Sequence, residues 1–198
     1  CYAKRNKTYG LSTLRTRHVK TTESDIRFQF VGKKGKEHDI AITDEKLIDL
    51  VNQCEEIPGW ELFQFYDSDG SKDHVDSTMI NEYIHELSGD LFSAKDFRTW
   101  AATKIFFECL RDLGYIAEEK QNAKNLLTAY DAAADGLGNT RTVCRNYYVH
   151  PVIPEAYADG SIVPYFEKVD RIKPKSGSHL SRTETVIKEM LANYEVNI

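Results

Sequence analysis

Long apolar runs are absent from this sequence, since no stretch approaches the roughly 18 consecutive apolar residues that a membrane-spanning helix needs. We therefore expect no membrane role. Cysteine is also scarce, and its four positions (Cys1, Cys54, Cys109 and Cys144) include no Cys-x-x-Cys pair. This spacing argues against a zinc site and, with no signal-peptide pattern in view, favours a reducing, cytoplasmic setting. The six histidines show no metal-ligand spacing either, so we expect no metal.

A net positive charge is missing as well, because the formal net charge at pH 7 is -5. The charges are unevenly distributed, however. Residues 1–36 hold ten lysines and arginines against two acidic residues, whereas the other 162 residues hold 16 against 29. This asymmetry indicates that one end of the molecule meets a polyanion while the rest is solvated. On composition alone, a basic surface without a partner remains an alternative.

Residues 9–44 alternate between apolar and polar side chains in the manner of β-strands. Three short strands are expected, one near Leu11 and Thr13, one over 26–31 and one around 40–42. The second and third are joined at 32–35 by Gly-Lys-Lys-Gly, which predicts a turn that carries two lysines on an exposed hairpin tip.

From Asp44 onward the apolar residues follow a helical period. Helices are predicted around 47–51, 79–87, 93–113, 123–137, 143–148 and 186–194, with breaks at Pro58–Gly59, Gly89, Gly114 and Gly138. The helix that follows an N-cap at Ser93 is predicted to bury Phe97, Ala101, Ile105 and Cys109. The stretch 151–177 is rich in proline, glycine and turn residues and is predicted to be loop.

Four segments of the chain, taken together, carry a family resemblance. They are YGLSTLRTRHV at 9–19 with FVGKKG at 30–35, ELFQFYD at 61–67, AKDFRTW at 94–100, and LGNT at 137–140 running into VCRNYYVHP at 143–151. In this order and spacing, residues 2 to about 160 resemble the type IB DNA topoisomerases of bacteria and poxviruses. The resemblance implies an α+β catalytic domain over 1–198, with a three-stranded antiparallel sheet part over 1–44 and a mainly helical part over 45–198.

The resemblance also implies that supercoiled duplex DNA is relaxed by transient cleavage of one strand, without ATP, metal or cofactor. Tyr148 matches the nucleophile that forms a 3′-phosphotyrosyl intermediate. Arg98 matches an arginine that binds the nonbridging phosphate oxygens, for which a planar donor fork is suited. Lys33 matches the general acid that protonates the leaving 5′ oxygen. Asn139 stands where poxviral enzymes have a histidine, and its amide can donate to a phosphate oxygen without titrating.

Other residues are expected to contact DNA, by the resemblance or by their charge: Lys95, Tyr2, Arg15, Arg17 and Lys34. Lys95 matches a phosphate-contacting lysine of the family. Because bacterial members often carry asparagine at the position of Asn139, we expect a bacterial protein that works as a cytoplasmic, nucleoid-associated monomer. Its partner is expected to be double-stranded DNA, with no nucleotide bound.

One catalytic arginine of the family has no match in the chain. It lies six residues before the tyrosine matched by Tyr2, a point upstream of Cys1. We therefore expect the natural protein to continue upstream through this arginine and an N-terminal DNA-clamping domain. Because loss of one oxyanion-stabilising donor costs roughly 10² to 10³ in rate, the isolated chain is predicted to be inactive or very weak.

Two other functions compete with this interpretation. Tyrosine recombinases share the fold and the nucleophile but carry His-x-x-Arg where this chain has Lys95 and Arg98. The other alternative is a DNA-binding module that has lost catalysis. Singly, each residue also has a structural explanation: Arg98 as a surface ion-pair partner, for example, and Tyr147 as a packing residue that pairs with Val143.

Overall fold

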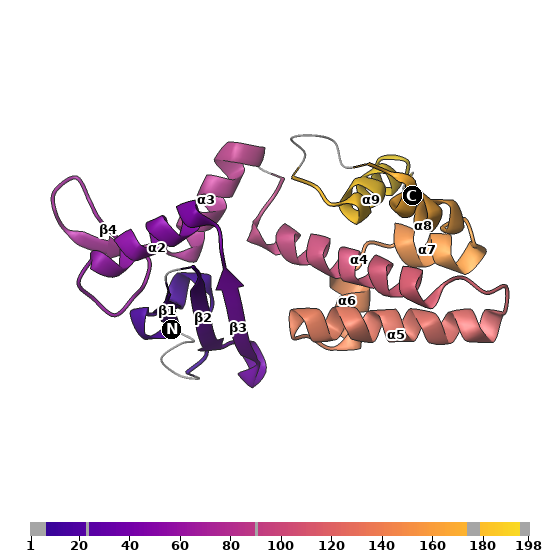
Figure 1. Ribbon diagram of the computed structural model, residues 1–198, viewed down its shortest axis with the longest axis horizontal. Helices are drawn as coiled ribbons and strands as arrows, with labels where there is room; N and C mark the ends of the chain where they lie inside the picture. The colour runs from indigo at the N-terminus through magenta and orange to yellow at the C-terminus, as the bar shows by residue number, and fades with distance from the viewer. Residues whose placement is uncertain (1–6, 23, 90, 174–178, 195–198) are drawn as a thin grey trace. The chain divides into compact units, whose positions relative to one another are not determined.

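The computed structural model describes residues 7–22, 24–89, 91–173 and 179–194 (Figure 1). The chain divides into two compact units, Cys1–Ser93 and Ala94–Ile198. The division falls well after the sheet, so that two helices belong to the same unit as the strands. A single catalytic domain over 1–198 stays a prediction.

The sheet of the first unit is antiparallel, as expected. Its strands, in spatial order, are β1 (Val19–Thr21), β2 (Ile26–Val31) and β3 (Glu37–Ile42). Phe28 of β2 pairs with Val19 on one side and with Ile40 on the other. This register turns Ile26 and Phe28 toward one face, where both are buried, in keeping with the alternation of the sequence.

The strand predicted near Leu11 and Thr13 is wrong. This segment forms a 3-10 turn, η1 (Leu11–Thr13), and a second one, η2 (Thr16–His18), leads directly into β1. The Thr13 hydroxyl closes the first turn by accepting a hydrogen bond from the Gly10 backbone N–H at 2.9 Å. Threonine makes such local bonds readily, and they compete here with the extended pattern suggested by the apolar spacing.

Two helices and a hairpin complete the first unit: α2 (Glu45–Glu56), β4 (Gln64–Tyr66), β5 (Lys72–His74) and α3 (Ser77–Ser88). Both helices were expected from the sequence. Asp44 caps α2 by accepting from the Leu47 N–H, and Gly89, at φ 85°, ends α3. The β4–β5 hairpin was not expected from the sequence.

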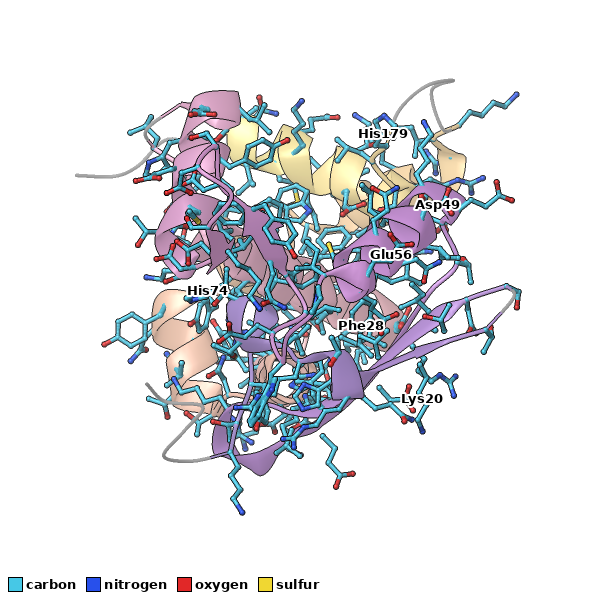
Figure 2. The ribbon with its side chains drawn as sticks, turned by 90° about the vertical axis from the view of Figure 1, so that its left-hand side faces the viewer. Lys20, Phe28, Asp49, Glu56, His74 and His179 are labelled. Carbon is cyan, nitrogen blue, oxygen red and sulfur yellow. The ribbon has the colours of Figure 1, made fainter. Side chains whose placement is uncertain are left out.

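The core of the first unit lies between its sheet, α2 and the segments around 14 and 62. Its buried apolar residues are Leu14, Val19, Ile26, Phe28, Val51 and Leu62. Figure 2 labels Phe28 of this core and Lys20 of β1, whose side chain is exposed. The two thus lie on neighbouring strands but in opposite environments.

The second unit is helical. Its helices are α4 (Ala94–Leu113), α5 (Glu119–Leu137), α6 (Arg141–Tyr147), α7 (Val152–Asp159), α8 (Val163–Arg171) and α9 (Arg182–Ala192). Helix α4 is central, since it packs against α5, α7 and α9. Together with the sheet of the first unit, this helical part confirms the predicted α+β class.

The expected loop over 151–177 is wrong, because this stretch contains α7 and α8. Pro151 is the N-cap of α7, and Pro164 lies in the first turn of α8. At those positions proline has no hydrogen bond to break. Gly160, at φ 81°, then ends α7. The prolines and the glycine that suggested loop therefore mark the ends of two short helices.

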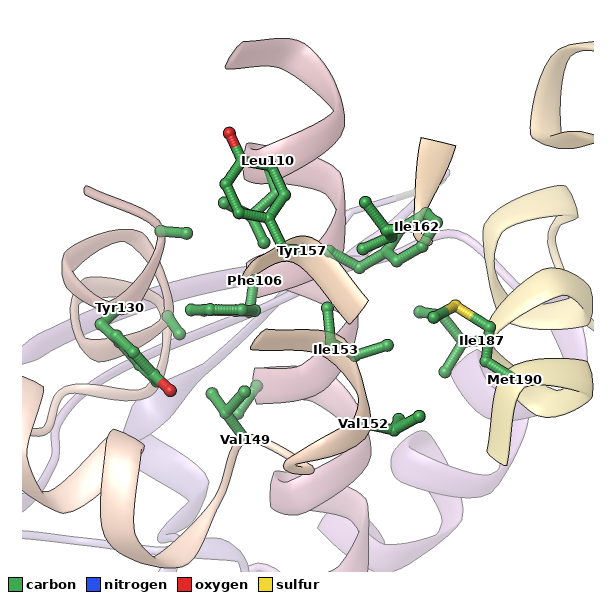
Figure 3. Close-up of a cluster of buried hydrophobic side chains, with 14 of the residues drawn as sticks. Phe106, Leu110, Tyr130, Val149, Val152, Ile153, Tyr157, Ile162, Ile187 and Met190 are labelled. Atoms are coloured by element: carbon green, nitrogen blue, oxygen red, sulfur yellow. The ribbon is translucent and has the colours of Figure 1, made fainter. Parts of the chain in front are cut away.

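The expected buried stripe of α4 also needs correction. Phe97 is 68% exposed, and the fully buried residues of the helix are Ala102, Phe106, Phe107 and Leu110 together with the polar Thr103. Figure 3 shows Phe106 and Leu110 in this core beside Tyr130, Ile153 and Tyr157. Because α4 is contacted from several sides, its apolar residues extend beyond one stripe and the pattern alone misplaces the buried face.

No helix among the described residues is long and apolar enough to cross a membrane. The cysteines at 54 and 109 are partly buried, and Cys144 is fully buried. All three are free thiols.

Candidate active site

Three of the four predicted catalytic residues lie in the second unit, at the ends of helices. Arg98 is on the second turn of α4, Asn139 follows the C-terminus of α5, and Tyr148 is the C-cap of α6. Gly138 brings Asn139 into place, because it takes up the left-handed conformation (φ 65°, ψ 38°) that ends α5. The chain can then turn at once into α6.

The guanidinium of Arg98 lies between the end of α5 and Tyr148. Its Nη2 donates a hydrogen bond to the Leu137 carbonyl oxygen at 2.9 Å, and its Cζ is 5.5 Å from the centroid of the Tyr148 ring. The Leu137 carbonyl is one of those that a helix C-terminus leaves without an intrahelical partner. Arg98 therefore closes the end of α5 and covers the tyrosine ring with the same group.

Asn139 has a side-chain donor with no partner. Its backbone N–H donates to the Ala134 carbonyl at 2.9 Å, which fixes the residue. Its side-chain Nδ2, however, is shielded from solvent and makes no hydrogen bond within the described part of the chain. Buried amide groups are nearly always hydrogen-bonded, and one left unpaired costs about 1–3 kcal/mol. Such a donor is suited to receive an oxygen atom of a ligand.

The backbone around Tyr148 is held by a buried hydroxyl. Thr103 of α4 is 1% exposed. Its Oγ1 accepts a hydrogen bond from the His150 backbone N–H at 3.1 Å and lies 3.3 Å from the Tyr148 carbonyl and 2.8 Å from the Thr99 carbonyl. Helix α4 therefore positions both Arg98 and the main chain on which the Tyr148 side chain stands.

The positive charge of Arg98 acts on the interior beside the tyrosine. Burial raises the pKa of the Cys144 thiol, and the Arg98 charge opposes this shift. For His150 burial has the opposite effect and lowers the pKa, whereas the charge of Glu155 raises it. The site thus combines a fixed positive charge with buried neutral groups, an environment that favours binding of an anion.

Two neighbours of these residues are exposed. Lys95 lies one turn before Arg98 in α4, a spacing that places both on one face of the helix. Tyr147 is 65% exposed, whereas Tyr148 is partly buried against the helical core. The interpretation of Tyr147 as a packing residue is therefore wrong. It is Tyr148 whose ring packs, beneath Arg98.

Lys33 belongs to the first unit. It lies in η3 (Lys33–Gly35), a 3-10 turn between β2 and β3, and its side chain is exposed. The Gly32 N–H donates to the Lys36 carbonyl at 2.7 Å, and Gly35 has φ 78°. The exposed, glycine-flanked turn predicted at 32–35 is confirmed. The Lys34 side chain and Tyr2 lie outside the described residues.

Arg15 and Arg17 form a cluster with aromatic rings. The Cζ of Arg15 is 5.4 Å from the ring centroid of Tyr9 and 5.8 Å from that of Trp60. Arg17 donates from Nη2 to the Tyr9 hydroxyl at 2.8 Å. Both arginines were predicted to contact DNA, and this role stays a prediction.

Thr103 and Trp60 do not stand out in the sequence. No local signal distinguishes a threonine that bonds to a distant backbone from one at the surface, because the partner segment lies 45 residues further along the chain. Trp60 directly follows Pro58–Gly59. Residues beside such a turn are often exposed, so this position was the one signal in the sequence for an exposed tryptophan. Among the described residues, no three side chains of His, Cys, Asp or Glu come together as metal ligands.

Comparisons with known proteins identify the family of the chain. Residues 2–162 match the family model of the eukaryotic DNA topoisomerase I catalytic core. The chain is similar to DNA topoisomerase 1B of Acanthamoeba polyphaga mimivirus, with 33% identity over 163 residues, which cover 79% of this chain and 48% of the viral protein. The chain thus spans about half the length of this curated relative. It belongs to the type IB DNA topoisomerase family, as part of the catalytic core.

Proposed function

We propose that this chain carries the site at which one strand of duplex DNA is cleaved and rejoined through Tyr148, so that supercoils relax. The observation that carries the proposal is that Arg98 contacts both the Tyr148 ring and the Leu137 carbonyl, two residues before Asn139. There, a guanidinium covers the tyrosine ring at 5.5 Å, and a shielded amide donor has no partner among the described residues. A phosphate oxygen bound to Asn139 Nδ2 would satisfy that donor.

In the forward step the phenol oxygen of Tyr148 attacks phosphorus. A bond between phosphorus and the tyrosine oxygen forms, the bond to the 5′ oxygen breaks, and the phenol loses its proton to solvent. Arg98 leaves the Leu137 carbonyl and binds the nonbridging oxygens, which gain negative charge in the transition state. Asn139 donates to one of these oxygens. Lys95, one turn from Arg98, binds an adjacent phosphate.

Lys33 supplies the proton that the leaving 5′ oxygen requires. Its exposed position on a short turn is consistent with insertion into a DNA groove, where a positioned ammonium acts as general acid. Attack by the free 5′ hydroxyl on the phosphotyrosyl bond reverses the first step. Because that bond conserves the energy of the phosphodiester, resealing needs no ATP, and the protein donors perform the charge stabilisation without a metal.

The proposed activity belongs to the whole protein and not to these 198 residues alone. The chain spans 48% of the length of the viral relative, so relaxation is proposed for the full-length protein. We expect the isolated chain to be inactive or very weak. We retain the expectation of a monomer that acts in the bacterial cytoplasm, although the relative to which the chain is similar is viral.

The test is relaxation of supercoiled plasmid in EDTA without ATP by the full-length protein and two variants. Tyr148→Phe removes the nucleophile, and Tyr147→Phe is the matched control, because it removes the same hydroxyl from the adjacent, more exposed tyrosine. We expect relaxation by the parent and by Tyr147→Phe but not by Tyr148→Phe. A folded, DNA-binding parent that relaxes no plasmid would instead indicate a binding module or a recombinase that needs a specific site.

A further inference from the structure

The cluster of Trp60, Arg15, Arg17 and Tyr9 in the first unit has no role in the chemistry proposed above. Trp60 is 77% exposed, the largest side chain of the cluster and an unusual residue to leave in water. We propose that this cluster is a second DNA contact, which binds the sugar–phosphate backbone of duplex DNA. The inference rests on the proposed function in one respect, namely that duplex DNA is the substrate.

The backbone beneath Trp60 is fixed, although the ring is exposed. The Thr16 N–H donates to the Trp60 carbonyl at 3.3 Å, and the Leu62 N–H donates to the Leu14 carbonyl at 2.9 Å. Between these bonds, Arg15 and Glu61 form an antiparallel bridge. Since Leu14 and Leu62 are both buried, the segment is anchored in the core. The indole is therefore presented on a rigid support.

The two arginines are oriented by aromatic rings and not by acids. Arg15 lies against both Tyr9 and Trp60, and Arg17 lies over the Tyr9 ring at 5.7 Å while bonding to its hydroxyl. No ion pair to either arginine is found within the described ranges. Both guanidinium charges therefore remain available to a phosphate, while the rings hold their planes in place.

His18, which lies beside Arg15 and Arg17, does not change the positive charge of the cluster. It is buried, and its Nδ1 accepts a hydrogen bond from the Arg15 N–H at 3.1 Å. Burial lowers its pKa, and the charges of Arg17 and Arg15 lower it further. A neutral imidazole thus lies under two cationic side chains, and the net positive charge of the cluster comes from Arg15 and Arg17.

The shape of the surface also favours a strand over an enclosed small molecule. The hollow lined by Arg15, Thr16, Arg17, Gly59 and Trp60 has a volume of about 190 Å³. Sites for small molecules usually measure about 300–1,000 Å³. A shallow hollow with an indole wall and two guanidinium groups suits one sugar–phosphate unit, with the arginines on phosphate oxygens and the indole against the deoxyribose.

We propose duplex DNA and not a single strand as the ligand, because the two expose different groups to the cluster. In a duplex the bases are stacked and paired, so the accessible surface along a strand is phosphate and sugar. A single strand would instead stack an unpaired base on the indole. The charge of the cluster fits both, and the experiment separates them.

The test uses the fluorescence of Trp60 itself, since the chain has only one other tryptophan, the partly buried Trp100. The emission of the Trp100→Phe variant is compared with that of a Trp60→Phe, Trp100→Phe double variant, so that the difference between the two comes from Trp60. Addition of a duplex oligonucleotide, with binding followed independently by anisotropy of a dye on the DNA, should change this emission in parallel with binding. The parent with both tryptophans should show the same change. Saturated binding with unchanged emission would overturn the proposal.

Variants then separate charge from packing. Arg15→Ala and Arg17→Ala should each lower the slope of log K against log salt by about 1. Trp60→Ala should weaken binding about two- to tenfold with the slope unchanged, because the indole carries no charge. Tyr83→Ala removes a 62% exposed aromatic residue from α3, which supplies nothing to the cluster, and should change neither quantity. Unchanged affinity and slope in the cluster variants would reject the contact.

Two further outcomes are distinct. A larger emission change with a single strand than with a duplex, at equal saturation, would contradict the duplex backbone contact in favour of base stacking. A Tyr148-dependent covalent adduct without any response of Trp60 would reject this site alone and leave the proposed function standing. Absence of any DNA binding by the folded protein would reject both.

Discussion

The hydroxyl of Thr103 contacts the main chain that directly follows the Tyr148 side chain. It accepts from the His150 N–H at 3.1 Å and lies 3.3 Å from the Tyr148 carbonyl oxygen. Thr103 stands five residues after Arg98 in α4. A single rigid helix thus sets the position of the proposed nucleophile relative to the proposed phosphate-binding arginine.

Replacement of Thr103 by valine keeps the shape of the side chain but removes this hydroxyl. We expect the single-turnover rate of DNA cleavage to fall about tenfold, which corresponds to about 1.4 kcal/mol, with DNA affinity unchanged. The protein should also lose about 1–3 kcal/mol of stability, because the buried His150 N–H is left unpaired. Stopped-flow cleavage, DNA titration and thermal unfolding measure the three quantities.

Two controls distinguish positioning by Thr103 from general destabilisation. Thr103→Ser retains the hydroxyl and should restore most of the rate. Ile187→Val, in the core but without a bond to the Tyr148 segment, should cost about 0.5–1.5 kcal/mol of stability and leave cleavage unchanged. A rate loss in Ile187→Val equal to that in Thr103→Val would show that Thr103 has only a structural role.

Arg98→Lys keeps the positive charge but loses the planar fork. We expect cleavage to slow by roughly 10² to 10³, the effect of losing one oxyanion donor, while DNA affinity changes little. Arg145→Lys is the matched control, because Arg145 lies 6.0 Å from the Tyr130 ring and not over Tyr148. Equal effects of the two substitutions on the cleavage rate would argue against a catalytic role of the Arg98 guanidinium.

Asn139→Ala should separate stability from activity. Because Asn139 Nδ2 is shielded without a protein partner among the described residues, its removal should leave the unfolding free energy unchanged or raised. The cleavage rate should fall at least about tenfold, since one donor to the phosphate is lost. Thermal unfolding and single-turnover cleavage of the same variant decide the matter. A destabilised protein with normal cleavage would show that the amide serves the fold and not the phosphate.

Glu184 predicts a dependence of stability on pH. Hydrogen bonds from Ser181 first, then from the Trp100 Nε1–H at 3.0 Å, and the charge of Lys104 lower its pKa to about 2. Since the folded pKa lies below the unfolded value, the carboxylate stabilises the fold above pH 4.5, and this contribution is lost as the pH falls from 4.5 to 2. At about 1.4 kcal/mol per pKa unit it amounts to at most about 3.5 kcal/mol, and screening of this partly exposed carboxylate by solvent reduces it to about 1–3 kcal/mol.

The measurement is the unfolding free energy of the parent and of Glu184→Gln between pH 2 and 7. The difference between them should be largest above pH 4.5 and should shrink toward pH 2. Glu189→Gln, which removes a carboxylate from the same helix, is the control and should show a smaller difference. A constant difference between parent and Glu184→Gln across the range would contradict the assignment.

The sequence predicts those parts of the fold that depend on neighbouring residues. The turn at 32–35 and the ends of α3 and α5 at Gly89 and Gly138 were predicted, because glycine at positive φ marks them directly. The helices α7 and α8 were not, because proline and glycine within the chain indicate an end without saying whether a helix begins there. The buried face of α4 also escaped prediction, since the neighbours that bury Thr103 and Phe106 come from other helices.

The residues of the site also differ in whether the sequence predicts them. Motif spacing selected Arg98, Asn139 and Tyr148, and the fold places Arg98 beside the Tyr148 ring and Asn139 two residues beyond the carbonyl to which Arg98 donates. Residue types alone did not select Thr103 or Trp60, because the significance of each depends on what lies beside it in three dimensions. The shielded amide of Asn139 is likewise a property of the packed structure.

The central claim is that Tyr148 forms the covalent bond to DNA. The most direct measurement is denaturant trapping of the full-length protein on an oligonucleotide duplex, followed by protease digestion and mass spectrometry of the DNA-linked peptide. We expect the DNA to be attached by its 3′ phosphate to the phenol oxygen of Tyr148, in EDTA and without ATP, with no adduct in Tyr148→Phe. An adduct on Tyr147, a 5′ linkage, or an adduct that persists in Tyr148→Phe would contradict the claim.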